Sequence, residues 1–150
     1  MSSRYSSLFA RKNPSVTYRI MAILEDSPPF EDQDFELFSL HNDDVIYLAE
    51  NENDGFVHYE HWIEGKLIRR LKYNNDYSWL SAADEPEEWE KEILFTDEIL
   101  SKTLQGYEPE RHEEIKAVWM RKNIKEGDSF PVLGLLDFIG GINRYWKLPK

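Results

Sequence analysis

The spacing of apolar residues changes once along this chain, close to residue 84. Before that point, short alternating apolar runs are separated by turn-forming residues, which is typical of half-buried strands. After it, apolar residues recur three or four positions apart, as in amphipathic helices. Because the strands precede the helices, the sequence predicts an α+β fold. We expect a mostly antiparallel sheet of about five to six strands in residues 15–81, with C-terminal helices in residues 84–148 packed on one face of it.

The clearest signal in the strand region is a hairpin. Two strand-like runs, residues 56–63 and 66–73, flank the dipeptide Glu64-Gly65, and a two-residue loop ending in glycine is typical of a tight antiparallel turn. The earlier segment 25–34 contains Pro28-Pro29, which lacks backbone donors, and we predict it to be a loop. Further strands are predicted for residues 15–24, 35–40, 45–49 and 77–80.

Helix signals follow in the second half of the chain. A first short helix is expected to start at Asp84, and residues 96–98 form a second capped start, with Gly106 where that helix would end. Residues 108–123 give the strongest helical segment, because acidic residues stand at its start and basic residues at its end, as the helix dipole favours. Two more helical segments are predicted on either side of Gly140-Gly141, in residues 130–138 and 142–148.

The length of 150 residues suits one domain with one hydrophobic core. The chain has eight Phe, eight Tyr and five Trp, and this apolar area argues against intrinsic disorder. Cysteine is absent, which excludes disulfides, thiolate metal sites and cysteine nucleophiles. We therefore expect a single α+β domain over residues 1–150, in which residues 1–13 form a flexible N-terminal segment.

Acidic residues are concentrated in the first half of the chain. The net charge is −11, and residues 25–64 hold 13 Asp or Glu side chains without one Lys or Arg. A surface of this charge repels phosphate backbones and attracts basic proteins. The sequence therefore predicts no nucleic-acid partner. Two interpretations of the acidic block stay open: solvated loops that maintain solubility, or a binding surface for a basic protein partner.

The second interpretation gives the leading functional hypothesis, because the sequence offers no catalytic template. It has no nucleophile-elbow, dinucleotide-binding or phosphate-loop motif. Aromatic rings surrounded by charge are a common way to anchor a protein partner. We expect a non-enzymatic binding module, for instance an immunity-type inhibitor, that engages a basic partner. The candidate contact residues are Asp43, Asp44, Glu50, Glu52, Asp54, Trp62 and Trp79.

A small-ligand or metal-dependent enzyme is the alternative hypothesis. His58, Glu60 and His61 are candidate ligands, but on a strand His58 and Glu60 share a face while His61 points to the opposite one. A metal site would need a third ligand from elsewhere, such as His41 or His112. We predict neither a metal nor a cofactor, and we keep His58 and Glu60 as the residues that such a role would use.

A homo-oligomerising scaffold is the second alternative, with the apolar C-terminal tail as the contact between the subunits of a homodimer. The N-terminal residues contain no apolar stretch of signal-peptide length, and no uncharged apolar run approaches the length of a membrane helix. The expectation is a soluble cytoplasmic protein without membrane contact.

Overall fold

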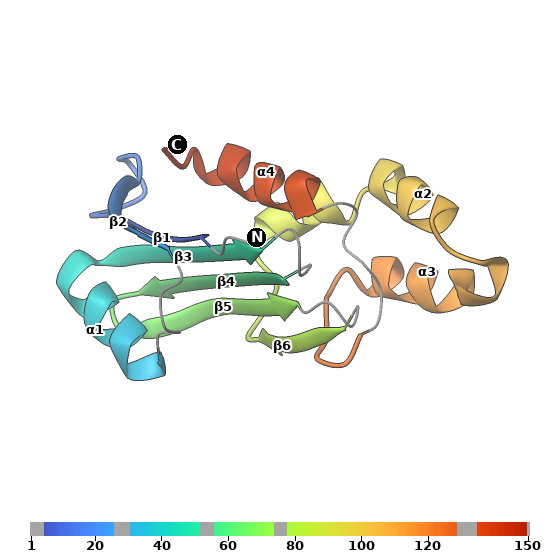
Figure 1. The fold of residues 1–150 in the computed structure, drawn as a ribbon, viewed down its shortest axis with the longest axis horizontal. Helices are drawn as coiled ribbons and strands as arrows, with labels where there is room; N and C mark the ends of the chain where they lie inside the picture. Colours follow the sequence, from blue (N-terminus) through green and yellow to red (C-terminus); the bar gives the residue numbers. More distant parts are fainter. Residues whose placement is uncertain (1–4, 26–30, 52–55, 74–77, 129–134, 150) are drawn as a thin grey trace.

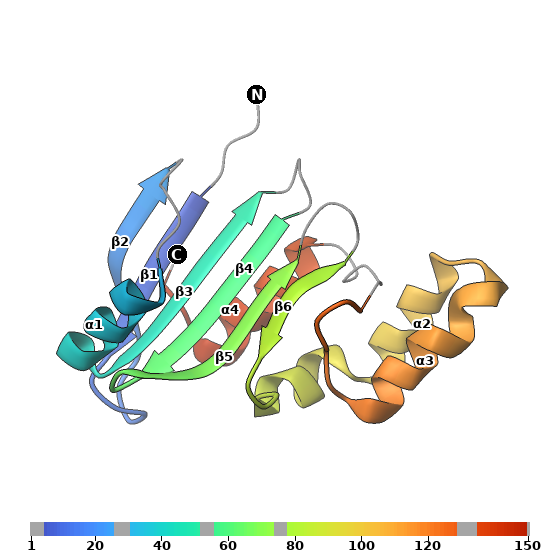
Figure 2. The same cartoon turned by 90° about the horizontal axis from the view of Figure 1, so that it is seen from below.

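A single antiparallel sheet organises the fold. The computed structural model describes residues 5–25, 31–51, 56–73, 78–128 and 135–149. The strands of the sheet are β1 (Tyr5–Arg11), β2 (Arg19–Glu25), β3 (Asp44–Asn51), β4 (Phe56–Ile63), β5 (Lys66–Tyr73) and β6 (Trp79–Ala83). Their spatial order is β2-β1-β3-β4-β5-β6, so β2 and β6 are the two edges (Figures 1 and 2). This sheet and the accompanying helices confirm the predicted α+β fold.

The predicted hairpin is present with the predicted bounds. β4 and β5 pair through the two-residue turn Glu64-Gly65. Both turn residues have positive φ, 48° at Glu64 and 83° at Gly65, which is the backbone that lets a two-residue turn follow the twist of its strands. Leu40 packs over Gly65, and a Cβ there would lie 2.9 Å from its Cδ2, so the leucine side chain would have to shift.

The N-terminal residues differ from the sequence expectation. Residues 5–11 were expected in a flexible segment, but they form β1, which pairs with both β2 and β3 inside the sheet. Leu8 and Ala10 are buried on one face of the sheet and Phe9 on the other. Both faces of β1 are covered, so its sequence does not alternate between apolar and polar residues. Its apolar stretch is also too short to predict a strand.

Residues 32–42 form a helix, so the prediction of a strand at residues 35–40 is wrong. The helix, α1 (Asp32–Asn42), starts behind Glu31, whose backbone N–H donates to Oδ2 of Asp34 at 2.8 Å. Such reciprocal caps satisfy backbone donors that a new helix leaves free. Phe35 and Ser39, four positions apart, are its buried residues, which fixes the face that packs on the sheet.

Helices lie on both sides of the sheet. α1 covers part of one face, whereas α4 (Leu135–Trp146) and η1 (Glu90–Leu94), a short π-helix, lie over the other (Figure 1). α2 (Asp97–Gln105) and α3 (His112–Arg121) form a pair beyond the β6 edge (Figures 1 and 2). A 3-10 turn, η2 (Pro109–Arg111), precedes α3.

Each face of the sheet has its own apolar cluster. The larger cluster joins Ile46, Tyr59 and Leu71 of the sheet to Trp89 and to Ile142 of α4. The smaller cluster, under α1, contains Leu8, Ala10, Phe35, Val45, Tyr47, Ala49 and Trp62. Consecutive residues of β3 therefore enter different clusters, as the alternation of side chains along a strand requires.

One helix runs through a pair of glycines that we predicted to separate two helices. α4 includes both Gly140 and Gly141. A Cβ on Gly141 would lie 2.6 Å from Cγ2 of Ile93, closer than real Cβ atoms approach. Gly141 thus allows η1 and α4 to pack closely, and tertiary packing overrides the low helix propensity of glycine.

Candidate functional site

The outer face of α1 carries two exposed leucines. Leu37 and Leu40 are 54% and 55% exposed. They lie three positions apart with Glu36 beside them, on the side of the helix away from the buried Phe35 and Ser39. The two side chains form a small exposed apolar patch among polar and acidic residues.

The β4–β5 turn extends this face. Leu40 lies against Gly65, and the neighbouring Glu64 is exposed. The backbone N–H of Glu64 donates to the carbonyl of Asp43 at 2.7 Å, which ties the turn to the end of α1. We call the following exposed residues the α1 surface: Gln33, Glu36, Leu37, Leu40 and Glu64.

The α1 surface keeps two uncompensated carboxylates. α1 contains no Lys or Arg. Its Asp32 is paired with Arg70, but within the described ranges no cation lies within 4 Å of the carboxylates of Glu36 or Glu64. These two carboxylates give the α1 surface an acidic character, which attracts basic groups.

Three of the seven predicted contact residues are buried. Asp44, Trp62 and Trp79 are 3%, 6% and 1% exposed. Trp62 stacks on Phe35, with ring centroids 6.0 Å apart, and its indole N–H donates to Glu60 at 2.8 Å. The expectation that Trp62 and Trp79 are exposed aromatic anchors is therefore corrected: both rings belong to the apolar clusters.

The other four predicted residues do not form one described surface. Asp43 is partly exposed, and its Oδ2 lies 3.4 Å from Nζ of Lys12. Glu50 is partly buried at the end of β3. Glu52 and Asp54 lie outside the described residues.

A buried ionic cluster accounts for part of the acidic block. The imidazole of His61 lies between two carboxylates, with Nε2 2.8 Å from Oδ1 of Asp44 and Nδ1 2.6 Å from Oε2 of Glu87. Asp44 also accepts from Nε of Arg11 at 2.7 Å and from the hydroxyl of Tyr18 at 2.7 Å. Because its carboxylates are matched by cations inside the fold, this cluster binds the elements together and offers nothing to a partner.

Two carboxylates set the charge of His61. Burial by itself lowers the pKa of His61, but the hydrogen bonds and charges of Asp44 and Glu87 outweigh it and raise the pKa to about 9. Burial has the opposite effect on Asp44 and raises its pKa, but hydrogen bonds from His61, Arg11 and Tyr18 hold that pKa below the usual value. At neutral pH the cluster thus contains an imidazolium between two carboxylates.

A second buried ion pair links β5 to η1. Arg69 donates from Nε and Nη2 to the two carboxylate oxygens of Glu90, at 2.9 and 2.7 Å, and both side chains are fully buried. Nη1 of Arg69 also donates to the carbonyl of Asp84 at 2.9 Å. This two-pronged geometry is typical of strong guanidinium–carboxylate pairs and has a structural role here.

His58 and Glu60 form a sealed pair on the α1 side of the sheet. Nε2 of His58 lies 2.7 Å from Oε2 of Glu60, and the two residues are 3% and 0% exposed. Glu60 also accepts from Nε of Arg70 at 2.5 Å and from Trp62. Burial lowers the pKa of His58 more than Glu60 raises it, which favours a neutral imidazole. The pair has the hydrogen bond of a general-base dyad, but both groups are enclosed by the fold.

The histidines named as possible further ligands do not complete a metal site in the described part of the chain. His41 is exposed on α1, and the ring of His112 bonds to the carbonyl of Tyr107 at 3.0 Å. Among the described residues, no group of three or more His, Asp or Glu side chains is arranged to hold a metal ion.

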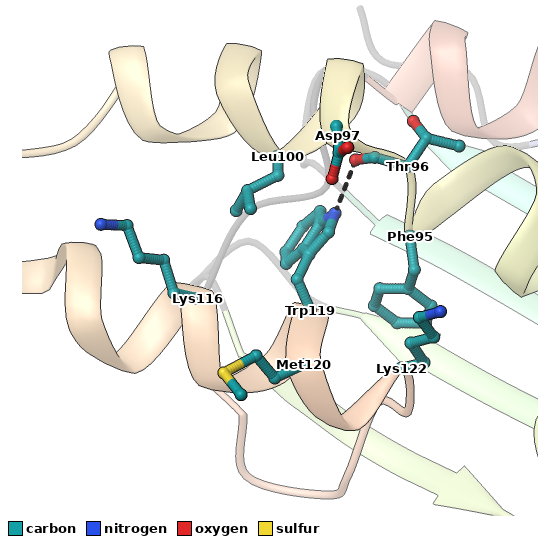
Figure 3. A pocket seen from close by; sticks show the side chains of 8 residues that line it. All are labelled: Phe95, Thr96, Asp97, Leu100, Lys116, Trp119, Met120 and Lys122. Carbon is teal, nitrogen blue, oxygen red and sulfur yellow. Dashed lines mark hydrogen bonds between the residues drawn. The ribbon is translucent and has the colours of Figure 1, made fainter.

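A groove of about 490 Å³ lies between α2 and α3 (Figure 3). The ring of Trp119 lies at its centre, packed edge-on against Phe95 with centroids 5.4 Å apart. Met120, at the lip, is 86% exposed. The residues that line the groove are Phe95, Thr96, Asp97, Leu100, Lys116, Trp119, Met120 and Lys122.

Comparison with known proteins gives no assignment. No protein-family model, no curated protein sequence and no solved structure matches the chain. Within the described ranges, no helix has the length and apolar character needed to cross a bilayer. The fold class and the surface chemistry are therefore the basis for a functional proposal.

The sequence contained a signal for the α1 surface that we did not use. Glu31 and Asp34 stand three positions apart, as in a helix cap, and Leu37 and Leu40 follow at helical spacing. The alternation of Phe35, Leu37 and other apolar residues favoured a strand instead. In a segment this short the two periods overlap, and the choice between them depends on packing.

Proposed function

We propose that this protein is a small cytoplasmic, non-enzymatic binding module of the immunity or inhibitor type. Its α1 surface engages a protein partner that is basic around an apolar recess. The observation that supports the proposal is the pair of exposed leucines, Leu37 and Leu40, on the same surface as the carboxylates of Glu36 and Glu64. This surface takes the place of Asp44, Trp62 and Trp79, which are enclosed in the fold, whereas a contact role for the other four residues stays a prediction.

The two parts of the α1 surface have different roles in binding. Covering the exposed halves of two leucines is worth roughly 2 kcal/mol, or about a thirtyfold gain in affinity. The carboxylates contribute mainly to the rate of encounter and to the choice of partner, because exposed charges are screened by salt. A basic active site on a toxin would provide a surface of this kind.

The enzymatic alternative has less support. A general base must reach its substrate directly or through one water molecule. His58 and Glu60 are enclosed by the rings of Phe35 and Tyr47 and by Trp62, and every contact that the structure gives them is internal. Their arrangement suits a role in holding α1 on the sheet.

The test is affinity capture from extracts of the native host, with binding measured on the purified partner. We expect the wild-type protein and the control variant Leu80→Ser to bind one basic protein with equal affinity. Leu80, on β6, is 48% exposed and matches Leu37 in chemistry but lies outside the α1 surface. The double variant Glu36→Lys/Leu37→Ser should bind at least about tenfold more weakly.

Salt provides an independent measurement. Raising the ionic strength should slow association of the wild-type protein with its partner, and Glu36→Lys should reduce that dependence. The charge-reversed control Glu126→Lys, at an exposed position in the loop after α3, should keep most of it. Wild-type affinity in the Glu36→Lys/Leu37→Ser variant would show that the binding surface lies elsewhere.

A further inference from the structure

The groove between α2 and α3 combines an apolar floor with two ammonium groups. The indole N–H of Trp119 donates to the carbonyl of Thr96 at 3.2 Å, which fixes the ring at the floor. Lys116 and Lys122 lie on either side of Trp119 (Figure 3). A fitting occupant is therefore apolar in its middle and acidic beside it.

The two lysines are available for an acidic occupant. Nζ of Lys116 lies 3.8 Å from Glu113, but the two side chains are 48% and 88% exposed, so this pair is weak. In the part of the chain that the structure describes, no carboxylate lies within 4 Å of the Lys122 ammonium group. Asp97 is the acidic residue in the lining, which leaves the groove with a positive balance.

Met120 leaves an apolar surface open at the lip of the groove. It is 86% exposed, and the partly exposed Leu100 lies on the opposite wall, across the ring of Trp119 (Figure 3). Methionine side chains adapt their shape to irregular apolar partners and are frequent at binding surfaces. Met120 and Leu100 therefore give an apolar occupant contacts outside the buried Trp119.

Lys122 occupies a backbone position that favours glycine. It follows the last turn of α3 with φ 54° and ψ 38°, in the left-handed region, and its N–H donates to the carbonyl of Val118. Any side chain with a Cβ is strained there, so glycine would stabilise the fold. Lys122 shares this conformation with Lys147, which follows α4, and a cation at either position suits the negative end of the helix dipole.

The chain itself contains the occupant that this groove suits. The α1 surface presents Leu37 and Leu40 beside Glu36, which is apolar in the middle and acidic at the side. We propose that the α1 surface of one copy docks into the α2–α3 groove of a second copy. This inference rests on the proposed function, because it takes the α1 surface to be the binding surface and gives it a second occupant.

The positions of the two surfaces determine the form of the assembly. α1 lies at one end of the longest axis of the molecule, and α2 and α3 lie at the other end (Figures 1 and 2). A single copy therefore cannot join its own surfaces, and the contact between copies is head-to-tail. Repetition of such a contact gives an open chain of molecules, unlike a two-fold dimer. A second copy and an external basic partner then compete for α1.

Sedimentation over a range of protein concentrations tests the inference. At physiological ionic strength, where charges are screened beyond about 8 Å, the wild-type protein should sediment faster as concentration rises, without a plateau at the dimer. Met120→Ser and Lys116→Glu/Lys122→Glu should each weaken association at least about tenfold. Lys102→Glu is the matched control, because Lys102 is a 54% exposed cation on α2 outside the groove lining, and it should assemble like the wild type.

Mixing two assembly-defective variants gives the sharpest outcome. Met120→Ser keeps a normal α1 surface and a cationic groove that repels the lysine introduced at position 36, and Glu36→Lys/Leu37→Ser keeps a normal groove. Each should be monomeric alone, and the mixture should form a heterodimer that grows no further. If the mixture stays monomeric, or if the wild type is monomeric at every concentration, the second copy is not the partner. In that case the proposed function would still be supported if the wild-type protein binds a basic protein and the Leu37 variant does not. If neither self-association nor such binding is found, both the inference and the proposed function are rejected.

Lys122→Gly separates binding from folding. It should raise the melting temperature by removing the left-handed strain, and it should weaken association severalfold by removing the charge. Lys147→Gly is the matched control, because Lys147 also has φ 54° and follows α4. That control should raise the melting temperature and leave association unchanged. Unchanged association in Lys122→Gly would contradict the role of the lysine in the groove.

Discussion

Nδ1 of His61 lies 2.6 Å from Oε2 of Glu87, and this contact joins the centre of the sheet to the segment that leads into η1. The opposite ring nitrogen bonds to Asp44 on β3, so one imidazole connects three parts of the chain. The cluster also removes Asp44 and Glu87 from the acidic surface, because carboxylates paired with cations inside the fold contribute little to the charge of the surface.

Replacement of His61 by glutamine should destabilise the protein. The substitution leaves Asp44 and Glu87 buried without their shared cation, and breaking such a buried pair costs about 3–5 kcal/mol. Urea unfolding of His61→Gln measures the loss. The control His41→Gln, at an exposed position on α1, should change stability by less than about 0.5 kcal/mol. Equal stability of the two variants would mean that the cluster is not charged as described.

The same histidine should make stability depend on alkaline pH. Burial lowers the pKa of His61, but Asp44 and Glu87 raise it to about 9, above the value of about 6.5 expected in the unfolded chain. The stabilisation from the imidazolium is therefore complete below a pH of about 6.5 and is lost as pH rises through 9. The unfolding midpoint of the wild-type protein, measured from about pH 6 to about pH 10, should fall as the pH rises. The slope should be flatter in His61→Gln.

The Arg69–Glu90 pair should show strong coupling in a double-mutant cycle. Arg69→Met alone leaves the carboxylate of Glu90 buried and unpaired, and Glu90→Gln alone leaves the guanidinium of Arg69 in the same state. Each change should cost about 3–5 kcal/mol, while the double variant should cost clearly less than their sum. Additive losses in denaturant unfolding would contradict a direct interaction between the two side chains.

Two neighbouring glycines in α4 should respond differently to alanine. Gly141→Ala places a Cβ 2.6 Å from Cγ2 of Ile93 and should destabilise by about 1–3 kcal/mol, as overpacking does. Gly140→Ala meets only the flexible end of Arg144, at 3.3 Å, and should be neutral or stabilising by up to about 1 kcal/mol. Thermal unfolding compares the two variants. Ile93→Ala should restore part of the loss in Gly141→Ala, and no rescue would contradict the close contact.

Local signals in the sequence were sufficient for several elements. The β4–β5 hairpin has the predicted bounds, because Glu64-Gly65 defines both the turn and the register of the strands around it. α2 starts behind Thr96, whose side chain accepts from the N–H of Ile99 at 3.2 Å, and ends at Gly106, as its capping residues predicted. In each case the deciding interactions lie within a few residues of one another.

The errors fall where distant residues decide. α1 was predicted as a strand because its apolar residues fit either period, and the choice was made by packing of Phe35 against Tyr47 and Trp62. α4 includes Gly141 where the side chain of Ile93 packs directly against the helix backbone and leaves no room for a Cβ. Neither neighbour is close in sequence, so no local pattern contained the information.

By itself, the sequence determined the α+β class, the tight hairpin, the capped helix α2 and the excess of acidic residues. Only the tertiary structure decided which of those acids lie on the surface. Asp44 and Glu60 lie inside because Arg11, His61, His58 and Arg70 meet them there, whereas Glu36 and Glu64 stay outside next to two leucines. The physical reason is that a carboxylate can be buried only where cations and hydrogen-bond donors from other strands converge on it, and that convergence is a property of the fold.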